Sequence, residues 1–256
     1  MFSRLSDRMR SRSAALLLTI DNRLDVILKY WLLIAGLASL LRIMAAPHKV
    51  PVASASTFAS YMLLVIAPFV STLLALRWFS DGHLQRQPTT RLAHIGRWQR
   101  ISRGEAERHP LYGTTGIMVS LIVGMMLNVP VRAAEYLAAI PPIPAVAPHW
   151  FSVLHFAMTF DTVLFSSLYM IAFVAALRRV PLFPRLLLAI WLGDLAMQLV
   201  TAQMVAATHV PEVVAAALHN VLLGNVKKVL ISMALWLPYL LLSTRVNVTY
   251  RHRIPA

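Results

Sequence analysis

The chain has 256 residues, of which 58% are hydrophobic and only 13% are charged, and its formal net charge is +14. Soluble domains are about a quarter charged, so this composition excludes an ordinary soluble globular protein. The sequence contains no cysteine, which excludes a disulfide scaffold, a cysteine-ligated metal or iron–sulfur site and a cysteine nucleophile.

The first 25 residues are basic, and they carry Phe2, Leu5 and Met9 one to two helical turns apart. Arginines flank these apolar residues, a pattern typical of a helix that lies on a membrane surface. The apolar stretch 14–20 is too short for a secretory signal sequence, and charged residues follow it directly. We therefore expect residues 1–25 to form a basic interfacial segment, with a disordered basic tail as the alternative.

Six apolar runs follow, at 26–46, 50–76, 111–131, 150–177, 183–207 and 229–244. A hydrocarbon core of about 30 Å needs about 20 helical residues, which the sixth run barely reaches. The runs lack the alternation of apolar and polar residues that is typical of an outer-membrane β-barrel. The sequence therefore predicts an all-α, polytopic transmembrane helix bundle with about six spans.

Lysine and arginine fall mostly on one side of this arrangement. Eighteen of them precede the first run, follow the sixth, or lie between runs two and three or runs four and five. The other side has only Lys49, Arg132, Lys227 and Lys228. Because cytoplasmic loops are enriched in Lys and Arg, both termini are predicted to be cytoplasmic. Basic residues placed between apolar runs also favour anionic lipids over nucleic acid as partners.

The predicted organisation is a basic N-terminal segment, a two-span extension at 26–78, a basic cytoplasmic loop at 79–107 and a four-span membrane domain at 108–251. Within the loop, Leu92, Ile95 and Trp98 recur every third residue among arginines. This pattern favours contact with lipid headgroups, with Trp98 as an anchor, and no RNA-binding motif accompanies it. The apolar link 208–225 is expected to form a helix on the outer surface.

Two carboxylates fall inside apolar runs, Asp161 and Asp194. Each lies 11 residues into its run, about 16 Å deep, on consecutive antiparallel helices. They would share a proton, or pair with Lys227 and Lys228, which directly precede the sixth run on its outer side. Three interpretations stay open: a structural polar clasp, a proton- or cation-coupled translocation site, and carboxyls that face a partner subunit or a water-filled vestibule.

No catalytic or metal-binding pattern accompanies these aspartates. The outer-side histidines are His149, His155, His209 and His219, and no two of them are spaced four residues apart. Hydrolase, metalloprotease, P-loop and dinucleotide fingerprints are missing from the sequence. We therefore expect no metal, no cofactor and no enzymatic activity.

The C-terminal run Trp236-Leu-Pro238-Tyr239, followed by Ser243-Thr-Arg245-Val246 and Thr249-Tyr250, resembles the closing signature of a family of small bacterial inner-membrane proteins. That family is catalogued as a domain of unknown function. The basic pair Arg178 and Arg179, with Phe-Pro at 183–184, is similar to the segment between its middle helices. The resemblance covers residues 108–251 and leaves 1–105 unmatched. It implies a bacterial inner membrane with both ends cytoplasmic, and it implies no activity.

The same residues suggest where lipid headgroups would bind. Arg245 follows the sixth run, and Arg178 and Arg179 follow the fourth, so all three are expected at the cytoplasmic headgroups. Core packing is the expected role of the signature aromatics Trp236 and Tyr239.

Taken together, these features favour a non-enzymatic accessory or assembly subunit of a larger membrane complex, in contact with the bilayer, anionic lipids and a membrane-protein partner. The alternative is a small proton- or cation-coupled transporter or channel that uses Asp161 and Asp194. A membrane-embedded enzyme is the third hypothesis.

Overall fold

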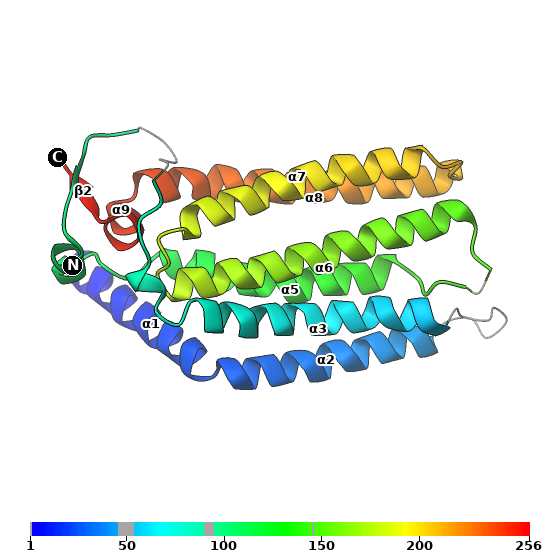
Figure 1. Ribbon diagram of the computed structural model, residues 1–256, viewed down its shortest axis with the longest axis horizontal. Coiled ribbons are helices and arrows are strands. Elements are labelled where there is room, and N and C mark those ends of the chain that lie inside the picture. Colours follow the sequence, from blue (N-terminus) through cyan, green and yellow to red (C-terminus); the bar gives the residue numbers. More distant parts are fainter. Residues whose placement is uncertain (1, 46–53, 90–94, 145) are drawn as a thin grey trace.

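The computed structural model describes residues 2–45, 54–89, 95–144 and 146–256. Across these ranges the chain forms nine α-helices, one short 3-10 helix and two short strands (Figure 1). Six helices are long and apolar enough to cross a membrane, which confirms the predicted all-α bundle with six spans. They are α2 (Leu24–Met44), α3 (Ser54–Trp78), α5 (Met118–Ala139), α6 (His149–Leu177), α7 (Phe183–Ala206) and α8 (Glu212–Leu242).

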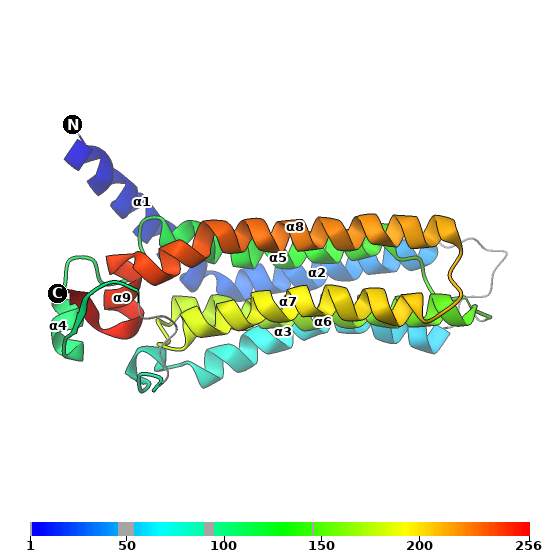
Figure 2. The ribbon, with the colours of Figure 1, turned by 90° about the horizontal axis from the view of Figure 1, so that it is seen from above.

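The six long helices pack in two layers. One layer holds α2, α5 and α8, and the other holds α3, α6 and α7 (Figures 1 and 2). Helix α6 is the centre of the bundle, because it contacts α3, α5 and α7. In its most apolar stretch 61% of the residues are buried, against 11% for α8. Helix α8 is therefore held mainly by α7 and leaves most of its surface to lipid or to a partner.

Two spans differ from their predicted bounds. Helix α5 begins at Met118 rather than at 111, because Gly113 and Gly116 adopt φ angles of 103° and 73° that interrupt a helix. It then continues through Pro130 to Ala139. Helix α8 begins at Glu212, directly after Pro211, and runs unbroken for 31 residues. The prediction of a separate surface helix at 208–225 is therefore wrong, since most of that segment belongs to the sixth span.

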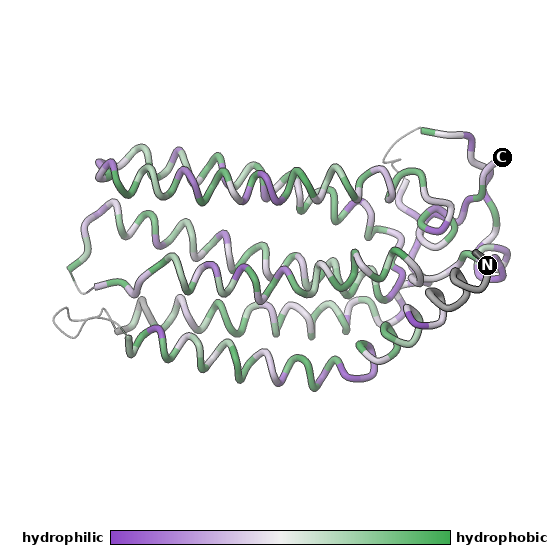
Figure 3. The backbone as a smooth tube through the Cα atoms, turned by 180° about the vertical axis from the view of Figure 1, so that it is seen from behind, coloured by the Kyte–Doolittle hydropathy of each residue, from purple (hydrophilic) through white to green (hydrophobic). Residues whose placement is uncertain are grey.

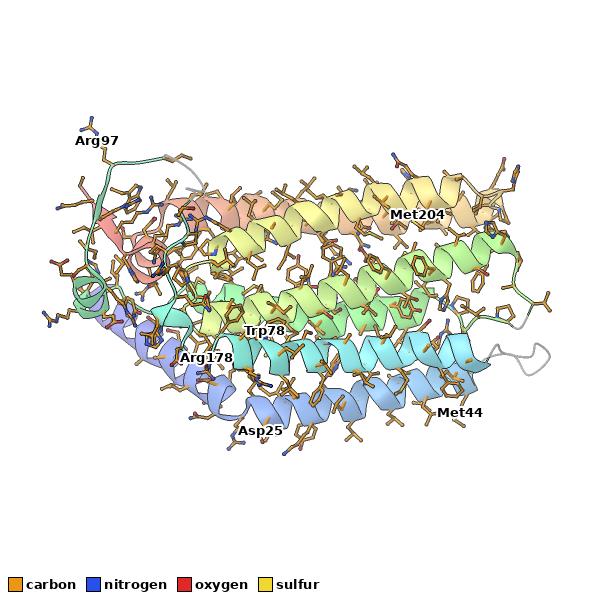
Figure 4. All side chains as sticks on the ribbon, viewed as in Figure 1. Asp25, Met44, Trp78, Arg97, Arg178 and Met204 are labelled. Carbon is orange, nitrogen blue, oxygen red and sulfur yellow. The ribbon has the colours of Figure 1, made fainter. Side chains whose placement is uncertain are left out.

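Both ends of the chain lie at the same end of the bundle (Figure 1). This end carries the short elements of the chain, among them η1 (Gly82–Leu84), and hydrophilic residues gather on it while apolar residues dominate the long helices (Figure 3). The other elements at this end are α1 (Phe2–Asn22), β1 (Trp98–Arg100), α4 (Arg103–Arg108), α9 (Thr244–Arg251) and β2 (Arg253–Pro255). We call it the basic end; Met44 and Met204 mark the opposite, far end (Figure 4).

Helix α1 is anchored to the bundle through its second half. Leu17 and Ile20 are buried in the core, and the Ser13 hydroxyl accepts a hydrogen bond from the Gly116 amide at 2.9 Å. The first half of the helix projects away from the long helices (Figure 2). This arrangement fixes α1 against the 111–117 turn.

The segment around Trp98 is not an amphipathic helix. Residues Trp98–Arg100 form β1, which pairs antiparallel with the C-terminal strand β2, and Leu92 lies outside the described residues. The Arg253 guanidinium lies 5.5 Å from the centre of the Trp98 ring, within cation–π range. The basic loop is therefore tied to the C-terminus.

The short helix η1 (Gly82–Leu84) packs its glycine against the α6–α7 turn. A Cβ on Gly82 would lie 2.6 Å from Val180 Cγ2 and 2.9 Å from the Arg178 carbonyl oxygen. We expect Gly82→Ala to destabilise the protein by roughly 1 to 3 kcal/mol, measured as a lower Tm in detergent. The matched control is Gly104→Ala in α4, where a Cβ meets nothing within 4 Å. Equal Tm values for the two variants would contradict the prediction.

Candidate functional site

A buried cluster of charged side chains inside the bundle is centred on Arg132 of α5. Its Nη1 donates to Oδ2 of Asp161 on α6 at 3.0 Å, and its Nη2 donates to Oδ2 of Asp194 on α7. The exposed fractions of these side chains are 12% for Arg132, 6% for Asp161 and 0% for Asp194. One guanidinium therefore bridges two buried carboxylates from successive helices.

The two aspartates lie near the middle of their helices. Asp194 is the twelfth residue of the 24-residue α7, and Asp161 is the thirteenth residue of the 29-residue α6. The structure brings the two carboxylates together, and the cation that joins them is Arg132 rather than Lys227 or Lys228.

The placement of Arg132 corrects the sequence-based topology. We expected it outside the membrane, after a span that ended at Val131. Because α5 continues to Ala139, Arg132 lies inside the helix and faces the bundle. Its polar neighbours Asn128 and Glu135 lie on the same face, at spacings of four and three residues, and Asn128 Oδ1 accepts from Arg132 Nε at 3.1 Å. This 128–132–135 stripe was the signal in the sequence that could have identified the site.

Amides complete the coordination of the carboxylates. The Gln198 side-chain amide donates to Oδ1 of Asp161 at 3.1 Å and to Oδ1 of Asp194 at 3.2 Å. Asn225 of α8 donates to the Gln198 side-chain oxygen at 3.3 Å. All four carboxylate oxygens therefore accept a hydrogen bond, and the chain of amides connects them to α8.

The charges at this site do not balance. Arg132 contributes one positive charge, whereas Asp161 and Asp194 contribute two negative charges, so the formal sum is −1 when all three are ionised. Rings of Phe165 and Tyr169 lie 5.3 Å and 5.8 Å from the guanidinium carbon and limit its hydration. An uncompensated charge in such surroundings is costly, so a state that also holds a proton or a small cation is favoured.

A cavity of about 370 Å³ opens beside the cluster, between α5, α6 and α8. Its volume lies within the range of about 300 to 1,000 Å³ of small-molecule sites. The polar residues that line it are Asn128, Arg132, Glu135, Tyr136, Asp161, Thr162, Tyr169, Asn220, Asn225, Lys228 and Ser232. The ion cluster therefore forms part of the wall of a space large enough for a small solute.

Lys227 and Lys228 lie in the middle of α8 and not at its outer end, where we predicted them. Lys228 lines the cavity and forms an ion pair with Glu135 of α5, and both side chains are about half exposed. Lys227 is exposed and does not line the cavity. Of the two lysines, Lys228 thus belongs to the site, as the partner of Glu135.

A second polar cluster lies closer to the far end. The Tyr136 hydroxyl forms hydrogen bonds with Thr159 at 2.7 Å and with His155 Nε2 at 3.3 Å. His155 is 1% exposed and lies within α6, six residues after the helix begins at His149. The described residues contain no group of three or more His, Asp or Glu side chains that could hold a metal ion.

The three arginines expected at lipid headgroups have contacts within the chain. Arg178 pairs with Asp21 of α1 at 3.2 Å, and Arg179 lies 5.2 Å from the centre of the Tyr112 ring. Arg245 Nη1 donates to the Thr115 hydroxyl at 2.8 Å and to the Leu111 carbonyl at 3.3 Å. These side chains therefore join α1, the 111–117 turn and α9 at the basic end.

The residues of the C-terminal signature lie where α8 passes into α9. Trp236, Pro238 and Tyr239 occupy the last two turns of α8 rather than the middle of a span, and the two aromatic rings contact each other edge to face at 6.0 Å. Ser243 separates the two helices, and Val246 is fully buried on α9. The residues of the signature thus form the junction that positions α9 at the basic end of the bundle.

Comparisons of the chain with protein-family models, with curated proteins and with solved structures find no match. The site must therefore be interpreted from its own chemistry.

Proposed function

We propose that this multipass membrane protein is a small proton- or cation-coupled transporter whose coupling site consists of Asp161, Asp194 and Arg132. The observation that supports it is the formal charge of −1 buried next to a polar cavity. A clasp that only held helices together would be most stable with balanced charges. The excess carboxylate provides a place where a proton or a cation binds and is released.

Helix α8 is the element whose movement would open the cavity. It is the least buried of the six spans and approaches α5 through side chains that line the cavity. Its described links to the site are the Asn225–Gln198 hydrogen bond and the Lys228–Glu135 ion pair. These bonds are few and polar, so a change of charge at the aspartates would be transmitted to α8 through them.

The proposal places the protein in a bacterial inner membrane, with the basic end in the cytoplasm. The support is the positive-inside distribution of Lys and Arg, and both chain ends lie at that end of the bundle. The resemblance of residues 108–251 to a family of inner-membrane proteins points to the same location.

Transport is tested with purified protein in liposomes that contain a pH indicator. An imposed potassium diffusion potential should drive proton uptake above that of protein-free liposomes; sodium and potassium are then tested with isotopes. We expect Asp161→Asn/Asp194→Asn to reduce the flux to the protein-free level. Asp25→Asn, which changes an exposed carboxylate on α2, should leave the flux unchanged. Absence of flux for all three cations, or equal flux in the double variant, would refute the proposal.

A second candidate function is that of an accessory subunit of a larger membrane complex. The observation in its favour is the exposed apolar surface of α8, which includes Leu230, Ile231 and Leu235. Purification in a mild detergent followed by mass spectrometry tests it, because an accessory subunit retains its partner in a fixed ratio. If the aspartate double variant loses cation flux but keeps its assembly state, the transporter hypothesis is supported. If the wild type shows no flux and the double variant loses a stoichiometric partner, the accessory-subunit hypothesis is supported.

A further inference from the structure

The ion pair between Lys228 and Glu135 borders the cavity and differs from the buried cluster beside it. Lys228 Nζ donates to Oε1 of Glu135, and the exposed fractions of the two side chains are 56% and 46%. Charges this open on membrane-spanning helices are costly unless water or a ligand solvates them. The carboxylate oxygens around Arg132, in contrast, all accept hydrogen bonds from the protein. The Lys228–Glu135 pair is therefore the one that a ligand can open.

Amide groups on the wall of the cavity complement this pair. Arg132 bonds to Oδ1 of Asn128 at 3.1 Å, which leaves the Nδ2 of this residue as a donor on α5. Asn225 donates through its Nδ2 to Gln198 at 3.3 Å, which leaves its Oδ1 as an acceptor on α8. Together with the ion pair, each of the two helices thus presents one donor and one acceptor to a ligand between them.

The charges of the wall cancel. The ionisable residues that line the cavity are two cations and two carboxylates: Arg132, Lys228, Asp161 and Glu135. The excess negative charge comes from Asp194 behind this wall, and the coupling proton or cation compensates it. A solute without net charge therefore fits the cavity best.

We propose that the cavity binds a small zwitterionic solute, an amino acid, with its carboxylate on Lys228 and its ammonium group on Glu135. This inference rests on the proposed function, because it names the solute that the coupling site would move. A zwitterion replaces one ion pair by two, whereas a solute with a single charge leaves Lys228 or Glu135 without a partner. The volume of about 370 Å³ lies at the lower end of the range for small-molecule sites, which favours a small solute.

The cavity connects the far end of the bundle with the coupling site. Its lining extends along α5 to Ala138 and Ala139, the last two residues of this helix. Asp161 belongs to the same wall, so the solute lies next to the carboxylates that hold the coupling ion. At such short range the charge of the ion affects the binding of the solute, as coupled transport requires.

Thermal unfolding of the whole protein in nanodiscs tests the site at equilibrium, without any gradient. The probes are glycine, L-alanine, L-serine and L-proline, and at least one of them should raise Tm by several degrees at saturation. Analogues that lack one charge, such as alaninamide and propionate for L-alanine, should bind at least about tenfold more weakly, because one ion pair is lost. Glycerol at equal concentration measures the non-specific effect of a polar solute.

Lys228→Met and Glu135→Gln should each abolish the rise in Tm. The matched controls are Lys227→Met and Glu212→Gln, since both residues are exposed on α8 and do not line the cavity. The double variant Glu135→Gln/Lys228→Met leaves no unpaired charge, so a purely structural ion pair would change its Tm and leave the rise intact. No rise with any of the four amino acids, an equal rise with glycerol, or a rise that persists in the double variant would overturn the proposal.

The outcome is independent of the flux assay in liposomes. Proton flux without binding of any of the four amino acids would overturn the zwitterion site and leave the transporter proposal standing. Amino-acid binding without flux of any cation would refute transport, while the binding site itself would be supported.

Discussion

Replacing Arg132 by glutamine is expected to destabilise the protein by about 3 to 5 kcal/mol, the cost of removing one partner from a buried ion cluster. The substitution leaves Asp161 and Asp194 facing each other with no cation between them. The unfolding temperature in nanodiscs should fall by more than about 6 °C, given that 1 kcal/mol shifts Tm by about 2 to 4 °C in chains of comparable size.

A triple variant without charges separates the electrostatic contribution of the cluster to stability from the contribution of packing. Asp161→Asn and Asp194→Asn, added to Arg132→Gln, remove all three charges and keep three hydrogen-bonding groups of similar shape. We expect this triple variant to be more stable than Arg132→Gln alone, since substitutions within one ion cluster are strongly non-additive. Arg23→Gln, at an exposed arginine between α1 and α2, is the control and should change Tm little. A triple variant less stable than Arg132→Gln would show that packing dominates.

The positions of Asp161 and Asp194 could be predicted from the sequence because a charged side chain within an apolar run has few tolerable surroundings. Counting residues from the ends of the runs gives the depth of each aspartate in the membrane. Antiparallel neighbouring helices then bring residues at the same depth side by side. Their distances to Arg132 depend on the rotation of α5, α6 and α7 about their axes, which the sequence does not state. The sequence therefore indicated that the carboxylates matter but not which cation joins them.

Arg132 was misplaced because Pro130 and the charge after it resemble the end of a span. A proline inside a helix removes one hydrogen bond, but a well-packed helix tolerates that loss. Helix α5 packs on both α2 and α6, and Val129 and Ala133 on either side of Pro130 are buried. Tertiary packing thus extends the helix past a residue that would end it in isolation.

The basic end was the least predictable part of the fold. The β1–β2 pairing joins residues about 155 positions apart, and Arg245 reaches carbonyls that are presented by the turn at 111–117. Gly113 and Gly116 shape this turn through positive φ angles, which a hydropathy pattern does not reveal. The structure places the residues of the C-terminal signature together at the α8–α9 junction, a location that the hydropathy pattern does not reveal.

Substitution of Tyr250 is also expected to lower the stability of the protein strongly, because this residue packs α9 against the end of α6. It is 1% exposed, its hydroxyl donates to the Ala176 carbonyl at 2.9 Å, and its ring centre lies 5.1 Å from that of Phe183. Burial raises the pKa of Tyr250 well above its usual value, so the hydroxyl stays protonated and remains a donor at physiological pH. We expect Tyr250→Ala to cost about 3 to 5 kcal/mol, as is typical of truncating a large buried aromatic residue.

Tyr250→Phe should cost only about 1 kcal/mol, because the ring stays in place and the Ala176 carbonyl keeps its bond from the Arg179 amide at 3.1 Å. Tyr30→Ala, at an exposed tyrosine on α2, controls for the loss of an aromatic ring. If Tyr250→Ala unfolded at the wild-type temperature, the contact of Tyr250 with the end of α6 would not stabilise the fold.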